Sequence, residues 1–242
     1  MQSWFDELKR VFVVSFIDDE RWRLLLRGLG VTLRITFFAL LIGIAIGVVV
    51  AIVRSTYDKN AGAMRRGPGR FILRFFNGVC KVYLTVIRGT PVVVQLMIFY
   101  FVILVSIKNA VLIGTLAFGI NSGAYLAEIF RSGIMSIDIG QFEAGRSLGF
   151  NYIQTMRYIV IPQAFKNTLP TIANEFIVLL KETAVVGYIG VQDLTKAGNI
   201  IYGRTYLAFM PLAAVAVVYL AIVMFFTWLV SKLERRLRSS ER

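Results

Sequence analysis

The sequence predicts an all-α membrane protein with five transmembrane helices. Of its 242 residues, 57% are hydrophobic and only 17% are charged, whereas an average soluble domain carries about 25% charged residues. The apolar residues stand in long uncharged blocks, and the basic residues behind the net charge of +13 flank those blocks. Such flanking is typical of chains that meet the anionic headgroups of a membrane. The pattern argues against a soluble protein and against nucleic acid as a partner.

Five segments are long and apolar enough to cross a bilayer, which takes about 20 residues. In the first, Gly43, Gly47 and Ala51 form a stripe of small residues that would let another helix approach closely. In the second, Thr90 and Pro91 form a helix start signal. The fourth is the weakest, because it contains three charged residues. The predicted spans are residues 31–53, 89–107, 110–131, 171–189 and 205–231.

The remaining segments set the expected orientation. Residues 1–28 form a polar, amphipathic segment without a cleavable signal pattern, so the first apolar block should remain as an anchor. The predicted membrane domain is 29–232, and 233–242 is a basic tail. Segments 54–81, 131–170 and 231–242 carry 16 Lys and Arg, against nine on the opposite side. This bias places the C-terminus and both long loops in the cytoplasm and the N-terminus outside.

Several kinds of chemistry lack the residues that they need. The chain contains no histidine, which removes histidine-based acid–base catalysis and histidine-ligated metal sites. Its one cysteine, Cys80, can form neither an intrachain disulfide nor a thiolate metal site by itself. No phosphate-binding loop of the form G-x-x-x-x-G-K-[ST] occurs, so this chain is not expected to hydrolyse ATP. We therefore expect no enzyme activity, metal or cofactor in this chain.

The loop of residues 136–164 carries helix signals between the third and fourth spans. Asp138, followed by Gln141, resembles a capping box, and Gly149 is a natural C-terminal stop. Asn151 and Gln154 repeat the capping signal, and two prolines are expected to end the second short helix and to mark entry into the fourth span: Pro162 and Pro170. Two short capped helices favour a docking element, while an amphipathic hairpin resting on headgroups is the alternative from spacing alone.

Four segments carry a resemblance to a known family. The string from Gly140 to Gly149, followed by Ile161-Pro162-Gln163-Ala164, is similar to the EAA loop of ATP-binding cassette importer permeases. Three further segments resemble the polar-amino-acid permease family of these importers, in the family's order and spacing across about residues 28–232. They are 86–96, 122–131 and 181–184. Gly145 stands where the family has its second alanine.

The resemblance implies a division of labour among subunits. Such permeases work in pairs, as two copies or with a related sister chain, in the bacterial inner membrane. Each docks a short coupling helix on a separate ATPase subunit that binds ATP and Mg, and an extracytoplasmic solute-binding protein delivers the substrate. The residues implied to contact the ATPase are Gln141, Glu143, Ala144, Gly145, Arg146 and Gly149.

Two polar stripes within the spans are candidates for the translocation path. Asn121, Tyr125 and Glu128 share one face of the third span, beside Ser122, and Glu175 shares a face of the fourth span with Glu182. Charged residues in a bilayer usually face a cavity or a partner. Glu128 and Glu182 lie near helix ends, where pairing or snorkelling is an equal explanation. Glu175 lies farther inside, which favours a substrate or gating role.

The expected function is that of a permease for a polar amino acid, with cationic side chains such as arginine or lysine favoured by Glu175. The alternative is a small ion channel or secondary carrier that works without ATP. A secondary carrier normally has internal repeats, and the halves of this chain show none.

Overall fold

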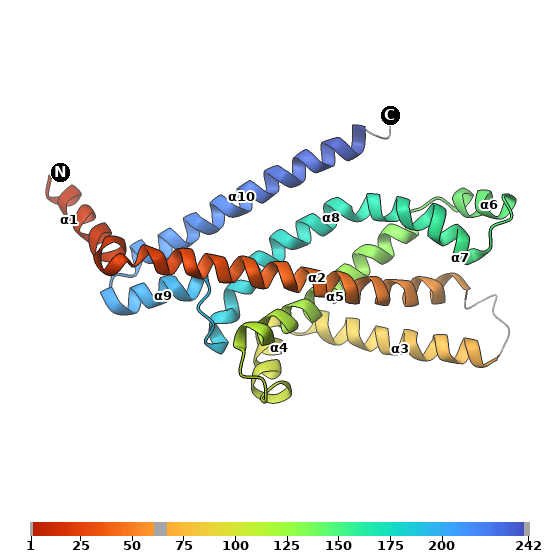
Figure 1. Cartoon of the computed structure of the whole chain (residues 1–242), viewed down its shortest axis with the longest axis horizontal. Helices are drawn as coiled ribbons and strands as arrows, with labels where there is room; N and C mark the ends of the chain where they lie inside the picture. The colour runs from red at the N-terminus through yellow and green to blue at the C-terminus, as the bar shows by residue number, and fades with distance from the viewer. Residues whose placement is uncertain (1, 61–66, 240–242) are drawn as a thin grey trace. The chain divides into compact units, whose positions relative to one another are not determined.

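The computed structural model describes residues 2–60 and 67–239, and every regular element in those ranges is a helix (Figure 1). The α-helices are α1 (Gln2–Phe12), α2 (Trp22–Asn60), α3 (Pro68–Gly89), α4 (Val92–Ile98), α5 (Ala110–Met135), α6 (Ile139–Ser147), α7 (Tyr152–Thr155), α8 (Ile161–Glu182), α9 (Leu194–Thr205) and α10 (Phe209–Ser239). Three π-helical turns are η1 (Val13–Ile17), η3 (Phe99–Ile103) and η4 (Met156–Val160), and two 3-10 segments are η2 (Asp18–Glu20) and η5 (Thr183–Ile189). Met1, residues 61–66 of the predicted basic loop and residues 240–242 of the predicted tail lie outside the described residues.

Three of the described helices are long and apolar enough to cross a bilayer: Trp22–Lys59, Ala110–Met135 and Phe209–Leu237. They correspond to the first, third and fifth predicted spans. The fourth predicted span is divided between α8 and η5 and does not pass the same test, since its charged residues lower its hydropathy. The predicted tail continues α10 as far as Ser239. The count of five spans is therefore not confirmed by length and composition.

The second predicted span begins where the sequence places its start signal, directly after Thr90-Pro91, but its helix extends only to Ile103. Helix α3 ends at Gly89, and α4 with η3 continues from Val92 after a bend of 111°. The bend falls at Thr90-Pro91, where the residue before a proline is driven into the extended conformation. Thr90 has φ −124° and ψ 147°, and its hydroxyl donates to the carbonyl of Val86 in α3. If this bent pair is one span, the number of candidates rises to four.

The predicted loop 54–81 is also mostly helical where it is described. Helix α3 is amphipathic, with its basic residues spaced by four or seven positions, which returns them to one side of a 3.6-residue helix. Those residues are Arg70, Arg74, Lys81 and Arg88. The side next to this basic stripe exposes phenylalanines and valines, including Phe71, Phe75 and Val82. The basic stripe lowers the average hydropathy of the segment, which is why its composition indicated a loop.

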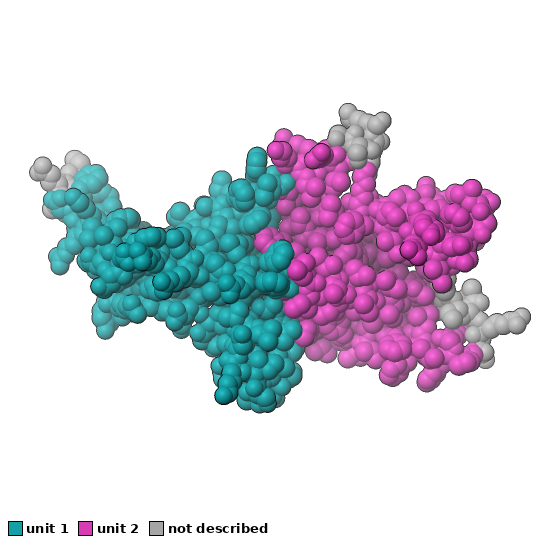
Figure 2. Space-filling model, in the orientation of Figure 1, with its two compact units in different colours: residues 1–38, 92–118, 177–229 teal, residues 39–91, 119–176, 230–242 magenta. Residues whose placement is uncertain are grey.

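The chain forms two compact units, each with its own core (Figure 2). Unit 1 comprises residues 1–38, 92–118 and 177–229, and unit 2 comprises residues 39–91, 119–176 and 230–242. Helices α2, α5, α8 and α10 contribute residues to both units. The candidate residues of the sequence fall mainly in unit 2.

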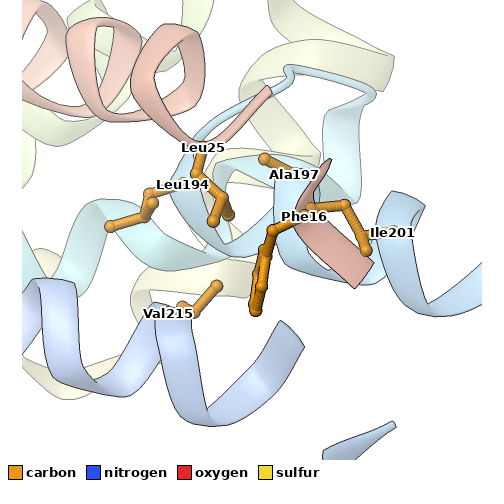
Figure 3. Close-up of a cluster of buried hydrophobic side chains, with 6 residues drawn as sticks. All are labelled: Phe16, Leu25, Leu194, Ala197, Ile201 and Val215. Atoms are coloured by element: carbon orange, nitrogen blue, oxygen red, sulfur yellow. The ribbon is translucent and has the colours of Figure 1, made fainter. Parts of the chain in front are cut away.

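The core of unit 1 joins the start of α2 to α9 and α10. Its buried side chains point toward one another in Figure 3: Phe16, Leu25, Leu194, Ala197, Ile201 and Val215. Asp193 caps α9 by accepting hydrogen bonds from the backbone N–H groups of Thr195 and Lys196. Burial raises the pKa of this carboxyl, while those N–H donors oppose the shift. The backbone N–H of Leu194 also donates to Thr32 Oγ1 of α2 at 3.2 Å.

In unit 2, α2 and α5 pack with little space between their backbones. A Cβ placed on Gly47 would lie 2.9 Å from Leu126 Cβ and 3.0 Å from the backbone nitrogen of Ala127. Ala51, one turn further, is 1% exposed. The predicted role of the small-residue stripe in close helix packing is therefore confirmed. From α3, the Tyr83 hydroxyl donates to the carbonyl of Ile120 at 2.6 Å, so three helices meet here.

Two glycines of α2 provide a matched test of how this helix packs against Asp193 within unit 1. A Cβ on Gly28 would lie 2.6 Å from the carbonyl oxygen of Asp193, whereas a Cβ on Gly30 would meet nothing within 4 Å. We expect Gly28→Ala to destabilise the protein by about 1–3 kcal/mol. Gly30→Ala should be neutral or stabilising by up to about 1 kcal/mol, since alanine favours helix. Thermal unfolding in detergent would measure both, and equal midpoints for the two variants would contradict the assignment.

Candidate functional site

A polar contact joins α5 and α8 in the interior of unit 2. Ser122 is fully buried, and its Oγ donates a hydrogen bond to Glu175 Oε1 at 3.1 Å. Asn121, the preceding residue of α5, is buried as well, and Glu175 is half-buried. The structure therefore brings Ser122, the candidate beside the first polar stripe, into contact with Glu175 of the second. A carboxylate in such surroundings attracts a cation more strongly than it would in water.

Glu128 lies nearer the end of α5 and is paired with arginines. Its Oε2 is 3.2 Å from Arg131 Nη2, and its Oε1 is 4.0 Å from Arg88 Nη1 of α3. Arg131 also lies 3.5 Å from Asp58 of α2, so the ion pairs connect three helices. The guanidinium carbon of Arg88 lies 5.6 Å from the centroid of the Tyr125 ring. Of the two explanations for Glu128, pairing is the one that the structure shows.

A cavity of about 580 Å³ opens beside this cluster. Tyr125 and Glu128 line it together with three cations that the sequence analysis did not select, Arg54, Lys81 and Arg88. Arg54 and Lys81 were missed because residues 54–81 were predicted to be a loop, and Arg88 was missed because it lies just before the second predicted span. The seven-residue spacing of Arg74, Lys81 and Arg88 is the signal that could have placed them on one side of a helix. A site with both signs of charge suits a zwitterion.

Glu182 is not part of this arrangement. It lies at the last position of α8, belongs to unit 1, and does not line the cavity. It is half-buried and is followed by Thr183, whose hydroxyl contacts the Thr36 hydroxyl of α2 at 3.4 Å. A role for Glu182 in binding remains a prediction without a contact that supports it.

The predicted first short helix is α6, and both of its ends have defined caps. At its start, Asp138 accepts a hydrogen bond from the backbone N–H of Gly140. At its end, Gly149 has φ +78°. The N–H of Gly149 donates to the carbonyl of Arg146, and the N–H of Phe150 donates to the carbonyl of Gly145. This pair of hydrogen bonds is the Schellman motif. The C-terminal stop at Gly149 is therefore confirmed, because glycine adopts positive φ without a steric cost.

The predicted capping box of α6 is only half correct. Gln141 does not complete it, since its side-chain oxygen accepts a hydrogen bond from Gln163 Nε2 of α8 at 3.1 Å. Phe142 anchors the same helix by packing into a buried cluster with residues from the end of α5, the turn that follows it, η4 and α8. That cluster comprises Ile134, Ile137, Phe142, Val160 and Ala164. Tertiary contacts thus use the face of α6 that Gln141 and Phe142 occupy.

Gly145 holds α6 against α7. A Cβ at this position would lie 2.7 Å from both Oγ1 and Cγ2 of Thr155. The departure from the family's second alanine therefore has a steric reason in this chain. The remaining candidate residues of α6 are exposed: Glu143, Ala144 and Arg146.

The second short helix is α7, and its capping box is confirmed. Asn151 accepts from the backbone N–H of Gln154, and Gln154 accepts from the N–H of Asn151, both at 2.9 Å. The prediction that Pro162 ends this helix and that Pro170 begins the next span is wrong, since both prolines lie within α8. Pro162 follows the π-helical turn η4, and Ile161 between them keeps the right-handed helical conformation. Helix α8 also contains a stripe of buried residues at four-residue spacing: Ala164, Thr168 and Ile172.

Comparison with known proteins identifies the relatives of this chain. Residues 43–239 match the family described as the binding-protein-dependent transport system inner membrane component. The chain is 35% identical over 216 residues to a putative glutamine transport system permease protein of Rickettsia typhi, covering 88% of this chain and 92% of the relative. It is also 35% identical over 221 residues to an arginine transport system permease protein of Bacillus subtilis, covering 90% of this chain and 94% of the relative.

Solved structures agree with these relatives. A crystal structure of an amino acid ABC transporter with histidines has a TM-score of 0.78 at 39% identity, covering 91% of this chain and 98% of the other. An inward-facing methionine ABC transporter has a TM-score of 0.70 at 21% identity, covering 88% of this chain and 96% of the other. The second match shows a shared fold alone.

Phe142 provides a test of how α6 is held. Phe142→Ala should free α6 from its cluster, since truncating a buried phenylalanine typically costs about 3–5 kcal/mol. We expect faster amide hydrogen exchange in residues 139–160. Ile139→Ala is the matched control, because Ile139 lies on the same helix and is 71% exposed. Equal protection in both variants would show that Phe142 does not anchor the loop.

Proposed function

The chain belongs to the family of binding-protein-dependent transport system inner membrane components, as the permease subunit of an amino-acid ABC importer, and we propose that it forms the path for a polar amino acid and couples this path to a separate ATPase. One observation carries the proposal. The exposed helix α6 packs on the ends of α5 and α8, the two helices that contribute Ser122 and Glu175 to the polar contact.

The proposed path begins with the polar residues of α5 and α8. Asn121, Ser122 and Tyr125 would offer hydrogen bonds to the substrate, and Glu175 would offer a negative charge. Glu128 lies near the end of α5 and pairs with Arg131 and Arg88. Glu175 is the candidate for favouring a cationic side chain such as that of arginine or lysine, because it is a half-buried carboxylate beside the buried Ser122. Glutamine and arginine are the substrates named for the relatives, which supports a polar amino acid.

The proposed coupling element is α6 with its caps. Glu143, Ala144 and Arg146 on its exposed side would contact the ATPase, while Gln141 and Phe142 transmit displacement of the helix to α5 and α8. Gly145 and Gly149 fix its position and its end. When the ATPase binds ATP with Mg and closes, α6 would move as a rigid body and shift the two helices that carry the path.

The remaining parts of the proposal concern orientation and partners. Five crossings of the bacterial inner membrane would place the N-terminus outside and the C-terminus and the α6 loop in the cytoplasm, as the distribution of basic residues favours. A second permease subunit, which is another copy or a related chain, would complete the path. A solute-binding protein outside the membrane would deliver the amino acid.

Glu175→Gln tests both substrate class and path. Glutamine keeps a carbonyl oxygen that can accept from Ser122, but it removes the charge. In proteoliposomes with the ATPase and binding protein, we expect uptake of arginine or lysine to fall about tenfold or more, since one lost ion pair of about 1.5–3 kcal/mol corresponds to that change. Glutamine uptake should change little. Equal loss for all three amino acids would assign Glu175 a structural role, and no amino-acid-stimulated ATP turnover in the wild type would refute the importer itself.

Gly149 tests the coupling proposal. Gly149→Val should distort the end of α6, because a β-branched residue disfavours positive φ. The complex should still assemble, with amino-acid-stimulated ATP turnover reduced about tenfold. Gly149→Asn should recover most of that activity, since asparagine tolerates the left-handed conformation. Steady-state ATPase assays would measure this order, and wild-type turnover in the valine variant would count against the assigned role.

A further inference from the structure

A second cavity, of about 550 Å³, lies beside α6 in unit 2 and has no part in the proposed path. Residues of the end of α2, of α6 and of the segment from Phe150 through α7 line it. Those that matter here are Lys59, Phe142, Arg146, Phe150, Tyr152 and Thr155. Its volume lies within the range of small-molecule sites. No acidic residue lines it, although Asp138 and Glu143 are near in sequence.

Two hydroxyl groups of this cavity are buried without a hydrogen-bond partner among the described residues. They are the phenolic oxygen of Tyr152 and Oγ1 of Thr155. The Thr155 side chain lies so close to Gly145 that a Cβ added there would be 2.7 Å from its Oγ1, and Thr155 is only 2% exposed. Buried hydroxyls in folded proteins are nearly always paired, and leaving one unpaired is unfavourable. Both side chains line the cavity, so a group bound there could supply the missing acceptors.

Two cations line the same cavity. The Lys59 ammonium lies 3.5 Å from the centroid of the Phe142 ring, a cation–π contact that holds it at the cavity wall. Arg146 contributes a guanidinium from α6. Ammonium and guanidinium groups make their strongest hydrogen bonds to ionised oxygens. Two cations and two hydroxyl donors, with no carboxylate in the lining, form the complement of an oxyanion.

We propose that this cavity binds an oxyanion, with Lys59 and Arg146 neutralising its charge and Tyr152 and Thr155 donating hydrogen bonds. The same chemistry has two sources. One is a free phosphate compound, and the other is a carboxylate side chain of a docked ATPase subunit. The residues that form the site all belong to this chain. Binding of a free phosphate compound therefore does not depend on the proposed coupling function, whereas binding of an ATPase carboxylate rests on it.

The first measurement uses the purified permease and inorganic phosphate. Thermal midpoints are compared in phosphate and in chloride at matched ionic strength, which removes general screening. The wild-type midpoint should rise saturably, by roughly 3–6 °C at ten times the Kd. The double variant Tyr152→Phe, Thr155→Val should lose this response. Without phosphate its midpoint should equal or exceed that of the wild type, since two unpaired hydroxyls are gone.

Charge variants distinguish anion binding in the cavity from anion binding at exposed cations elsewhere. Lys59→Gln should lose the phosphate response, whereas Arg157→Gln should keep it, because Arg157 is an exposed cation outside the cavity lining. A second measurement determines the affinity of each variant for the ATPase in phosphate-free buffer. A persistent phosphate response in the assembled complex identifies a free anion as the source. Loss of that response on docking, with weaker ATPase binding by the double variant and by Lys59→Gln, identifies a carboxylate of the ATPase.

Equal phosphate responses in the wild type and the double variant would overturn the proposal. So would the absence of any response together with unchanged ATPase affinity in every variant. Amino-acid-stimulated ATP turnover, measured on the same preparations, keeps the two ideas apart. Its presence without an anion effect refutes only the oxyanion site, and an anion effect without it refutes only the importer function.

Discussion

Close packing of α5 against α2 is the constraint on which the rest of unit 2 depends. Hydrophobic burial does not drive helices together in lipid, so association relies on contact between backbones that small residues allow. Gly47 leaves no room for a side chain between α2 and Leu126 of α5. Once α5 is placed, Ser122 reaches Glu175 of α8, Glu128 reaches the arginines, and the end of α5 supplies Ile134 to the cluster that anchors α6.

Polar groups within the helices are arranged in two different ways. Glu128 is satisfied by charge, through Arg131 on its own helix and Arg88 from α3, and each such half-exposed pair contributes at most about 1 kcal/mol. Their value lies in the connection of α2, α3 and α5 rather than in stability. Glu175 instead accepts a hydrogen bond from the hydroxyl of Ser122. Glu128 thus links neighbouring helices through charge, and Glu175 links α8 to α5 through a hydroxyl group.

The loop beyond α5 combines local and tertiary control. Asp138, Gly149, Asn151 and Gln154 define where the short helices begin and end, through hydrogen bonds to backbone groups a few residues away. Gln141 and Phe142 then attach α6 to the helices behind it. The exposed face stays open for a partner, and the back of the loop encloses a cavity with two unpaired hydroxyls. One short segment thus presents two chemically distinct surfaces.

The sequence by itself determined the helical membrane class, the caps of α6 and α7 and the packing role of Gly43, Gly47 and Ala51, because each depends on composition or on residues within a few positions of one another. It also selected Ser122 and Glu175, although not their contact. Only the tertiary structure decided that the chain bends at Thr90-Pro91 and that α8 continues through Pro170. The tertiary structure alone also placed the cations around Glu128 and showed why position 145 has no room for a side chain. These features depend on which distant helix faces each residue, and the sequence of one helix does not specify which helix becomes its neighbour.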